Sequence, residues 1–143
     1  MIKSNRKRIE QKRAEKALAF VRAGKELDQD KAKAYKAYVK KIPMMIKTNG
    51  LSAALAFVFS KGSKNGCVAQ NTPYGLIYTQ LFEWLEENHH NLFEGNANND
   101  NLIQQIIGLD GKAYRSVTIE LLALFTWLKR FADGMIEGEA QEN

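Results

Sequence analysis

The sequence predicts an all-α fold, a compact single-domain bundle of about six helices. Apolar residues recur at steps of three and four along several stretches, which is the spacing of one face of an α-helix. No run of four or more β-branched or aromatic residues alternates with period two, as a half-buried strand requires. A chain of 143 residues can bury a core without metal or disulfide cross-links. We therefore expect one helical domain over residues 1–136 and a disordered tail over 137–143.

Two helices are expected in the basic N-terminal third. The first covers residues 3–23, where a short apolar stripe is followed by Gly24. The second begins after Asp28 or Asp30, either of which can cap its N-terminus. Its apolar stripe continues past Pro43, so we expect a kink there, because proline lacks the backbone donor.

A tight corner at Gly50 separates the second helix from the third. The third helix is apolar and runs to about Ser60, and Gly62 can close it as a left-handed cap. Residues 61–71 are rich in Gly, Asn and Ser. This composition is typical of a loop.

The sequence of the C-terminal half predicts three more helices. Thr72 followed by Pro73 is a helix start, with a capping hydroxyl before a proline at the first helical position. This helix ends near Asn88, and a short helix covers residues 102–107. The last helix covers residues 116–136, has a wide apolar face, and is the expected core helix.

The charge is unevenly distributed. Residues 1–48 hold 15 Lys and Arg against 5 Asp and Glu, whereas residues 49–143 hold 6 against 11. A row of lysines recurs at helical steps on the second helix, away from its apolar stripe. Such a row fits a phosphate backbone, although a solvated basic helix or contact with an acidic protein surface would look the same. Charge alone indicates these candidate residues for contact with a polyanion: Lys33, Lys36, Lys40, Lys41, Lys47, Lys129 and Arg130.

The sequence predicts no enzyme, no cofactor and no metal site. It contains none of the metalloprotease, nucleophile-elbow, Walker or dinucleotide-binding motifs. His89 and His90 have no Cys or third His beside them that would complete a ligand set. Cys67 is the one cysteine and has no neighbouring base. A lone thiol and apolar runs too short to span a bilayer indicate a cytoplasmic protein.

Two blocks of sequence resemble the small helical subunit of the Cmr complex, the type III-B CRISPR RNA-guided effector. The likeness extends from Tyr35 to Met135. The first block contains Tyr38, Ile-Pro at 42–43, Asn-Gly-Leu at 49–51 and Ala-Leu-Ala-Phe at 54–57, and the second is AYRSVTIELLALFTWLKRFADGM at 113–135.

The resemblance implies an all-helical, non-catalytic subunit that acts in antiviral defence. Several copies would stack as a minor filament and help hold target RNA along the guide–target duplex. The implied partners are the other Cmr subunits, further copies of the chain, and guide and target RNA. No membrane and no small-molecule substrate are implied.

Two other classes of function remain open at this level. Residues 31–60 could form the helix-turn-helix of a small DNA-binding regulator, although 51–60 is almost wholly apolar and offers few groups to read bases. The second open class is a protein–protein assembly module. Tyr35 and Tyr38 could stack on bases, but their spacing fits the apolar stripe, and we expect both in the core.

Overall fold

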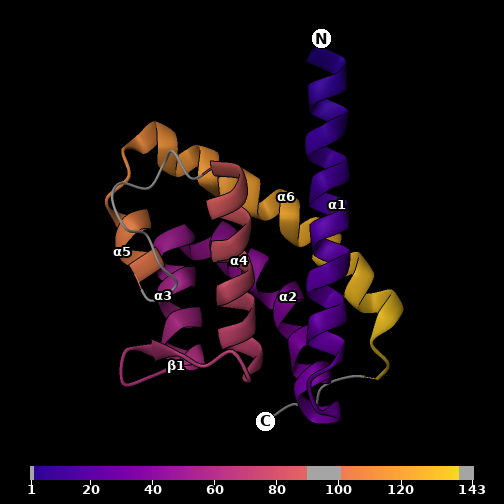
Figure 1. The fold of residues 1–143 in the computed structure, drawn as a ribbon. Coiled ribbons are helices and arrows are strands. Elements are labelled where there is room, and N and C mark those ends of the chain that lie inside the picture. Colours follow the sequence, from indigo (N-terminus) through magenta and orange to yellow (C-terminus); the bar gives the residue numbers. More distant parts are fainter. Residues whose placement is uncertain (1, 90–100, 139–143) are drawn as a thin grey trace.

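The computed structural model describes residues 2–89 and 101–138. Within these ranges the chain forms six helices and one short hairpin (Figure 1), which confirms the all-α prediction. The elements are α1 (Ile2–Lys25), α2 (Gln29–Asn49), α3 (Leu51–Gly62), β1 (Ser63–Lys64), β2 (Cys67–Val68), α4 (Pro73–His89), α5 (Leu102–Ile107) and α6 (Gly111–Met135).

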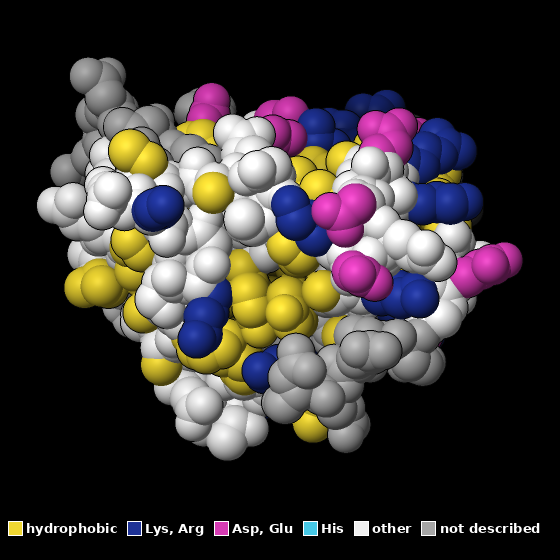
Figure 2. Space-filling view, turned by 90° about the horizontal axis from the view of Figure 1, so that it is seen from below, with side chains coloured by type: hydrophobic (Ala, Val, Ile, Leu, Met, Phe, Trp, Pro, Cys, Tyr) yellow, Lys and Arg dark blue, Asp and Glu magenta, His cyan; other side chains and the backbone are white. Residues whose placement is uncertain are grey.

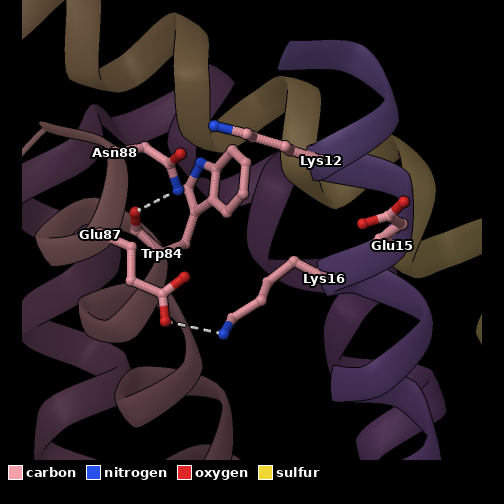
Figure 3. A pocket seen from close by; sticks show the side chains of 6 residues that line it. All are labelled: Lys12, Glu15, Lys16, Trp84, Glu87 and Asn88. Carbon is pink, nitrogen blue, oxygen red and sulfur yellow. Dashed lines mark hydrogen bonds and ion pairs between the residues drawn. The ribbon is translucent and has the colours of Figure 1, made fainter. Parts of the chain in front are cut away.

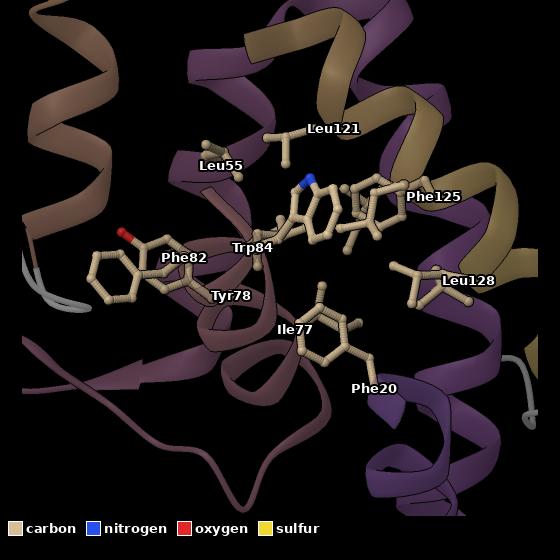
Figure 4. Packing of buried hydrophobic residues seen from close by; sticks show 14 of the residues in the cluster. Phe20, Leu55, Ile77, Tyr78, Phe82, Trp84, Leu121, Phe125 and Leu128 are labelled. Atoms are coloured by element: carbon tan, nitrogen blue, oxygen red, sulfur yellow. The ribbon is translucent and has the colours of Figure 1, made fainter. Parts of the chain in front are cut away.

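The core lies where α6 packs on α1 and α2 and where α3 packs on α2 and α4. Apolar residues of α6, including Phe125, are fully buried, and Figure 4 shows them against Trp84 and Ile77 of α4 and Phe20 of α1. The N-terminal turns of α1 extend past the rest of the bundle (Figure 1). The expected core helix is therefore confirmed.

Side chains fix several helix starts. Asp28, rather than Asp30, caps α2, since its Oδ1 accepts a hydrogen bond from Lys31 N at 3.0 Å. Thr72 Oγ1 likewise accepts from Gly75 N at 3.1 Å, as the Thr-Pro start predicts. The last helix begins at Gly111, five residues before the predicted start at Ser116.

The early start of α6 has a local cause. Asp110 Oδ1 accepts a hydrogen bond from Ala113 N at 2.9 Å, so Asp110 caps the helix.

Pro43 lies inside α2 without ending it. The helix boundaries determine which side of the bundle the lysines of α2 and the polar residues of α6 face.

The predicted loop over 61–71 contains a hairpin that the sequence analysis missed. Ser63 pairs with Val68 and Lys64 with Cys67 in antiparallel register. Asn65 and Gly66 connect the strands with φ values of 54° and 82°. Positive φ at both central residues is the type I′ turn that Asn-Gly favours, so the Asn-Gly pair was the available signal.

Gly62 is not the left-handed cap that we predicted. The described glycines with positive φ are Gly50, Gly66 and Gly138. Glycine is needed at Gly62 because α3 and α4 approach closely: a Cβ there would lie 2.4 Å from Gly75 N. The matching Cβ at Gly75 would lie 1.9 Å from the Ala69 carbonyl oxygen. Two glycines therefore allow the backbones to touch.

Candidate nucleic-acid interface

Three lysines of α2 lie on one side of the helix, as its periodicity predicts. Lys33, Lys40 and Lys47 fall within about 40° of one another around the axis. Lys47 is exposed, and Lys33 and Lys40 are half-buried. Met44 lies among them with 68% of its surface exposed. We call Lys33, Lys40 and Lys47 the α2 row.

The C-terminal half of α6 lies beside this row. Lys40 Nζ forms an ion pair with Asp133 Oδ1 at 2.5 Å. The hydrogen bond from Lys40 is the main cause that lowers the pKa of Asp133, and the charges of Lys40, Lys36 and Lys129 lower it further. Lys129 and Arg130 are both exposed on α6. The structure therefore brings α2 lysines and the Lys129 region together on one basic surface.

Lys36 is not part of the exposed row. Only 8% of its surface is exposed, and its Nζ donates hydrogen bonds to the carbonyl oxygens of Ile136 at 3.0 Å and Gly138 at 3.1 Å. The prediction that Lys36 faces away from buried structure is wrong. Lys36 lies about 60° from Val39 around the helix axis. It is therefore at the edge of the helix face that Ile136 and Gly138 cover.

Lys41 belongs to a different part of the surface. Its Nζ lies 5.2 Å from the centre of the Phe57 ring, and Lys61 lies 5.8 Å from the same ring. Next to Phe57, Tyr38 stacks on Tyr74 with ring centres 3.8 Å apart and an angle of 9° between the planes. Figure 2 shows the end of the molecule where α3 ends and α4 begins, with hydrophobic side chains gathered between lysines and arginines.

Tyr35 is a core residue, as expected, and is not available to stack on a base. It is fully buried. Its hydroxyl donates to Gln80 Oε1 at 2.6 Å and lies 3.3 Å from the Phe20 carbonyl oxygen. Burial raises the pKa of Tyr35 well above its ordinary value. Tyr38 is half-buried in the stack with Tyr74.

A buried polar cluster that the sequence analysis missed joins three helices. Glu120 of α6 is 7% exposed. It accepts two hydrogen bonds from Arg13 of α1, at 2.6 and 3.1 Å, and one from Trp84 Nε1 at 3.2 Å. Its Oε1 lies 3.0 Å from His89 Nε2 at the end of α4. We call Arg13, Trp84, His89 and Glu120 the Glu120 cluster.

The electrostatics of the Glu120 cluster favour a charged carboxylate. Burial alone would raise the pKa of Glu120, but the hydrogen bonds and charges of His89 and Arg13 together outweigh it and lower the pKa to about 2. Each polar group of the cluster has a partner, which is the usual arrangement for a structural ion pair. The cluster therefore fixes α1 and α4 to α6.

A shallow groove of about 420 Å³ lies between α1 and α4, next to this cluster. Figure 3 shows Lys16 and Glu87 reaching toward each other across it, with Nζ and Oε1 2.8 Å apart. The groove has Trp84 at its wall and Lys12 and Glu15 at its rim. It contains no nucleophile paired with a base, so its residues form no recognisable catalytic arrangement.

The described residues hold no group of three His, Cys, Asp or Glu side chains that could bind a metal ion. His89 instead pairs with Glu120, and His90 lies outside the described residues. No helix in the described part of the chain is both long enough and apolar enough to cross a membrane.

Comparison with known proteins gives three agreeing matches. The model of a family described as CRISPR-associated protein (Cas_Cmr5) matches residues 9–135. The CRISPR system Cmr subunit Cmr5 of Thermus thermophilus is 32% identical over 104 residues, which cover 72% of this chain and 75% of the relative. A crystal structure of a CRISPR-associated Cmr5 family protein from Thermus thermophilus superposes with a TM-score of 0.68 at 27% identity, covering 90% of this chain and 96% of that one.

Proposed function

Because the chain belongs to the Cmr5 family of CRISPR-associated proteins, we propose that it is a non-catalytic small subunit of a Cmr RNA-guided effector complex. In this role several copies stack as a minor filament in the cytoplasm. They help hold target RNA along the guide–target duplex while other subunits carry out catalysis. The basic surface formed by α2 and α6 is the observation that supports an RNA-holding role.

The chemistry of this surface suits phosphate more than base recognition. Lysine ammonium groups act as point charges toward phosphate oxygens. In an RNA-guided complex, base pairing reads the sequence and the protein contacts the backbone. We assign backbone contacts to the α2 row, Lys129 and Arg130. Lys41 is a more distant candidate, and Lys36 is available only if its contacts with Ile136 and Gly138 open.

The structure disfavours the DNA-binding regulator. In a helix-turn-helix the second helix presents polar side chains to the major groove. Here that helix would be α3, whose Leu51, Leu55 and Val58 are buried in the core. Its exposed positions include Ala53, Ala56 and Ser60, which offer few donors or acceptors to base edges.

The subunit assignment is tested by purifying the chain from its source with an affinity tag. We expect other Cmr subunits and guide RNA to co-purify. Recovery of the chain without them would contradict the assignment. The purified chain alone should leave RNA intact with or without divalent metal, and cleavage that disappears on changing one acidic residue would contradict the non-catalytic role.

The RNA-holding role predicts the effect of replacing Lys33, Lys40 and Lys47 with alanine together. In the assembled complex, RNA affinity should fall similarly for unrelated target sequences. The slope of log affinity against log salt should become shallower by about one or less per lost contact. Titration of labelled RNA at several salt concentrations measures both quantities.

A matched control replaces Lys25, Lys61 and Lys64, which lie outside α2 and α6, and removes the same charge. It should change RNA affinity less than the α2-row variant. Subunit content must be measured on the same preparations. Loss of the α2-row variant from the complex would indicate that this face docks on a protein neighbour, and full incorporation with unchanged affinity would contradict the role.

A further inference from the structure

The last described residues lie across the basic side of α2. After α6 ends, the chain turns toward the N-terminal half of α2 (Figure 1). Ile136 is 4% exposed and anchors this turn in the core. The carbonyl oxygens of Ile136 and Gly138 then accept hydrogen bonds from Lys36 Nζ, at 3.0 and 3.1 Å. We call Ile136–Gly138 the strap.

The conformation of Gly138 lets the strap pack against a second lysine. Its φ is +84°, and a Cβ at this position would lie 2.9 Å from Lys33 Cε. Any other residue would therefore meet both backbone strain and a contact with the Lys33 side chain. Glu137 and Gly138, which we expected in a disordered tail, thus lie against α2, and residues 139–143 lie outside the described residues.

The strap covers Lys36, a cation that would otherwise extend the α2 row. Lys33 and Lys36 lie about 60° apart around the helix and face the same side as Lys40. Glu137 adds a negative charge to the strap, and Glu139 and Glu142 follow in the sequence. Lys36 is held by two neutral carbonyl groups. An ammonium binds a charged phosphate oxygen more strongly than a neutral carbonyl, so a polyanion can replace these bonds.

We propose that the strap is an autoinhibitory segment that occupies Lys36 until RNA displaces it. This inference rests on the proposed RNA-holding role of the α2 row. Displacement would add one phosphate contact, from Lys36, beside the N-terminal end of the row. The subunit would then hold RNA less tightly with the strap in place than without it.

The test uses Gly138→Ala, which strains the strap without changing the charge. In the assembled complex this variant should bind labelled single-stranded RNA about three- to tenfold more tightly at low salt, and its salt slope should steepen by up to about one per subunit. Gly134→Ala is the matched control, since a Cβ at Gly134 meets nothing within 4 Å, and its affinity should stay unchanged. Adding Lys36→Met to Gly138→Ala should remove the gain.

A second measurement does not depend on RNA. Acylation by an amine-reactive reagent, followed by mass spectrometry, reports how accessible Lys36 is in the free protein. Lys36 should react slowly in the unaltered chain and several times faster in Gly138→Ala. A gain in RNA affinity while Lys36 stays protected would overturn the proposal, because the gain would not then come from the release of Lys36.

The two proposals can fail separately. Increased reactivity of Lys36 in Gly138→Ala with unchanged RNA affinity would overturn autoinhibition. The RNA-holding role would survive that result if replacing the α2 row still weakened binding. Unchanged affinity in both the α2-row variant and Gly138→Ala would remove the RNA-holding role itself and, with it, the inhibitory role of the strap.

Discussion

Replacing Phe125 with alanine should lower the free energy of unfolding by about 3–5 kcal/mol. Phe125 is fully buried where α6 meets α1 and α4 (Figure 4). The substitution removes apolar contacts and leaves a cavity that a close-packed core fills only in part. Unfolding in urea, monitored by circular dichroism, measures this change as a lower midpoint urea concentration at an unchanged dependence of the unfolding free energy on urea.

Ile119→Ala is the control for this prediction. Ile119 is a large apolar residue on the same helix, but 69% of its surface is exposed. Its replacement should change stability by less than about 0.5 kcal/mol. A Phe125→Ala effect as small as that of Ile119→Ala would mean that this face of α6 is not packed in the core.

Replacing Glu120 with glutamine should destabilise the protein by about 3 kcal/mol at neutral pH. The change leaves the Arg13 guanidinium, whose side chain is only 15% exposed, without its counter-charge. Removing one partner of a buried ion pair typically costs about 3–5 kcal/mol, and the remaining exposure of Arg13 places the effect at the lower end. Glu87→Gln breaks the more exposed pair with Lys16 and should cost less than about 1 kcal/mol.

The same residue predicts a pH dependence. The pKa of Glu120 is lowered from its ordinary value of 4.5 to about 2 in the folded protein. The Glu120 carboxylate therefore contributes fully to the free energy of unfolding above about pH 4.5. This contribution, about 3 kcal/mol in total, is lost as the pH falls toward 2. The stabilities of the unaltered chain and Glu120→Gln should converge between pH 6 and pH 2.5, and a constant difference would contradict the lowered pKa of Glu120.

Periodicity was sufficient to place the helices and most of the core. The apolar steps of Tyr35, Val39 and Ile42 identify the buried face of α2, and all three are fully buried. The Thr72–Pro73 pair marks the start of α4 because both of its signals act locally, through a capping bond and a fixed φ. Features that depend on one helix and its immediate neighbours in sequence are the ones the sequence predicts well.

Features that depend on distant parts of the chain were the ones missed. Lys36 is covered by Ile136 and Gly138, which lie about a hundred residues further along. Periodicity on α2 gives the angle of a side chain but not what covers it. Glu120 offered a weak signal, since a charged residue interrupts the apolar stripe of Val117, Leu121 and Leu124. Its partner Arg13 is 107 positions away, so the sequence alone did not identify the pair.

Cys67 is a natural site for chemical labelling, through which copies of this subunit can be counted. It is the chain's one cysteine, and its thiol is free and exposed on the hairpin. A maleimide reagent should therefore attach once per chain without any engineered residue. In a purified assembly, the labelled fraction of this subunit, measured from its own mass, would give the share of its copies whose hairpins face solvent. Comparing labelling before and after denaturation would separate total stoichiometry from hairpins that are covered by a neighbour.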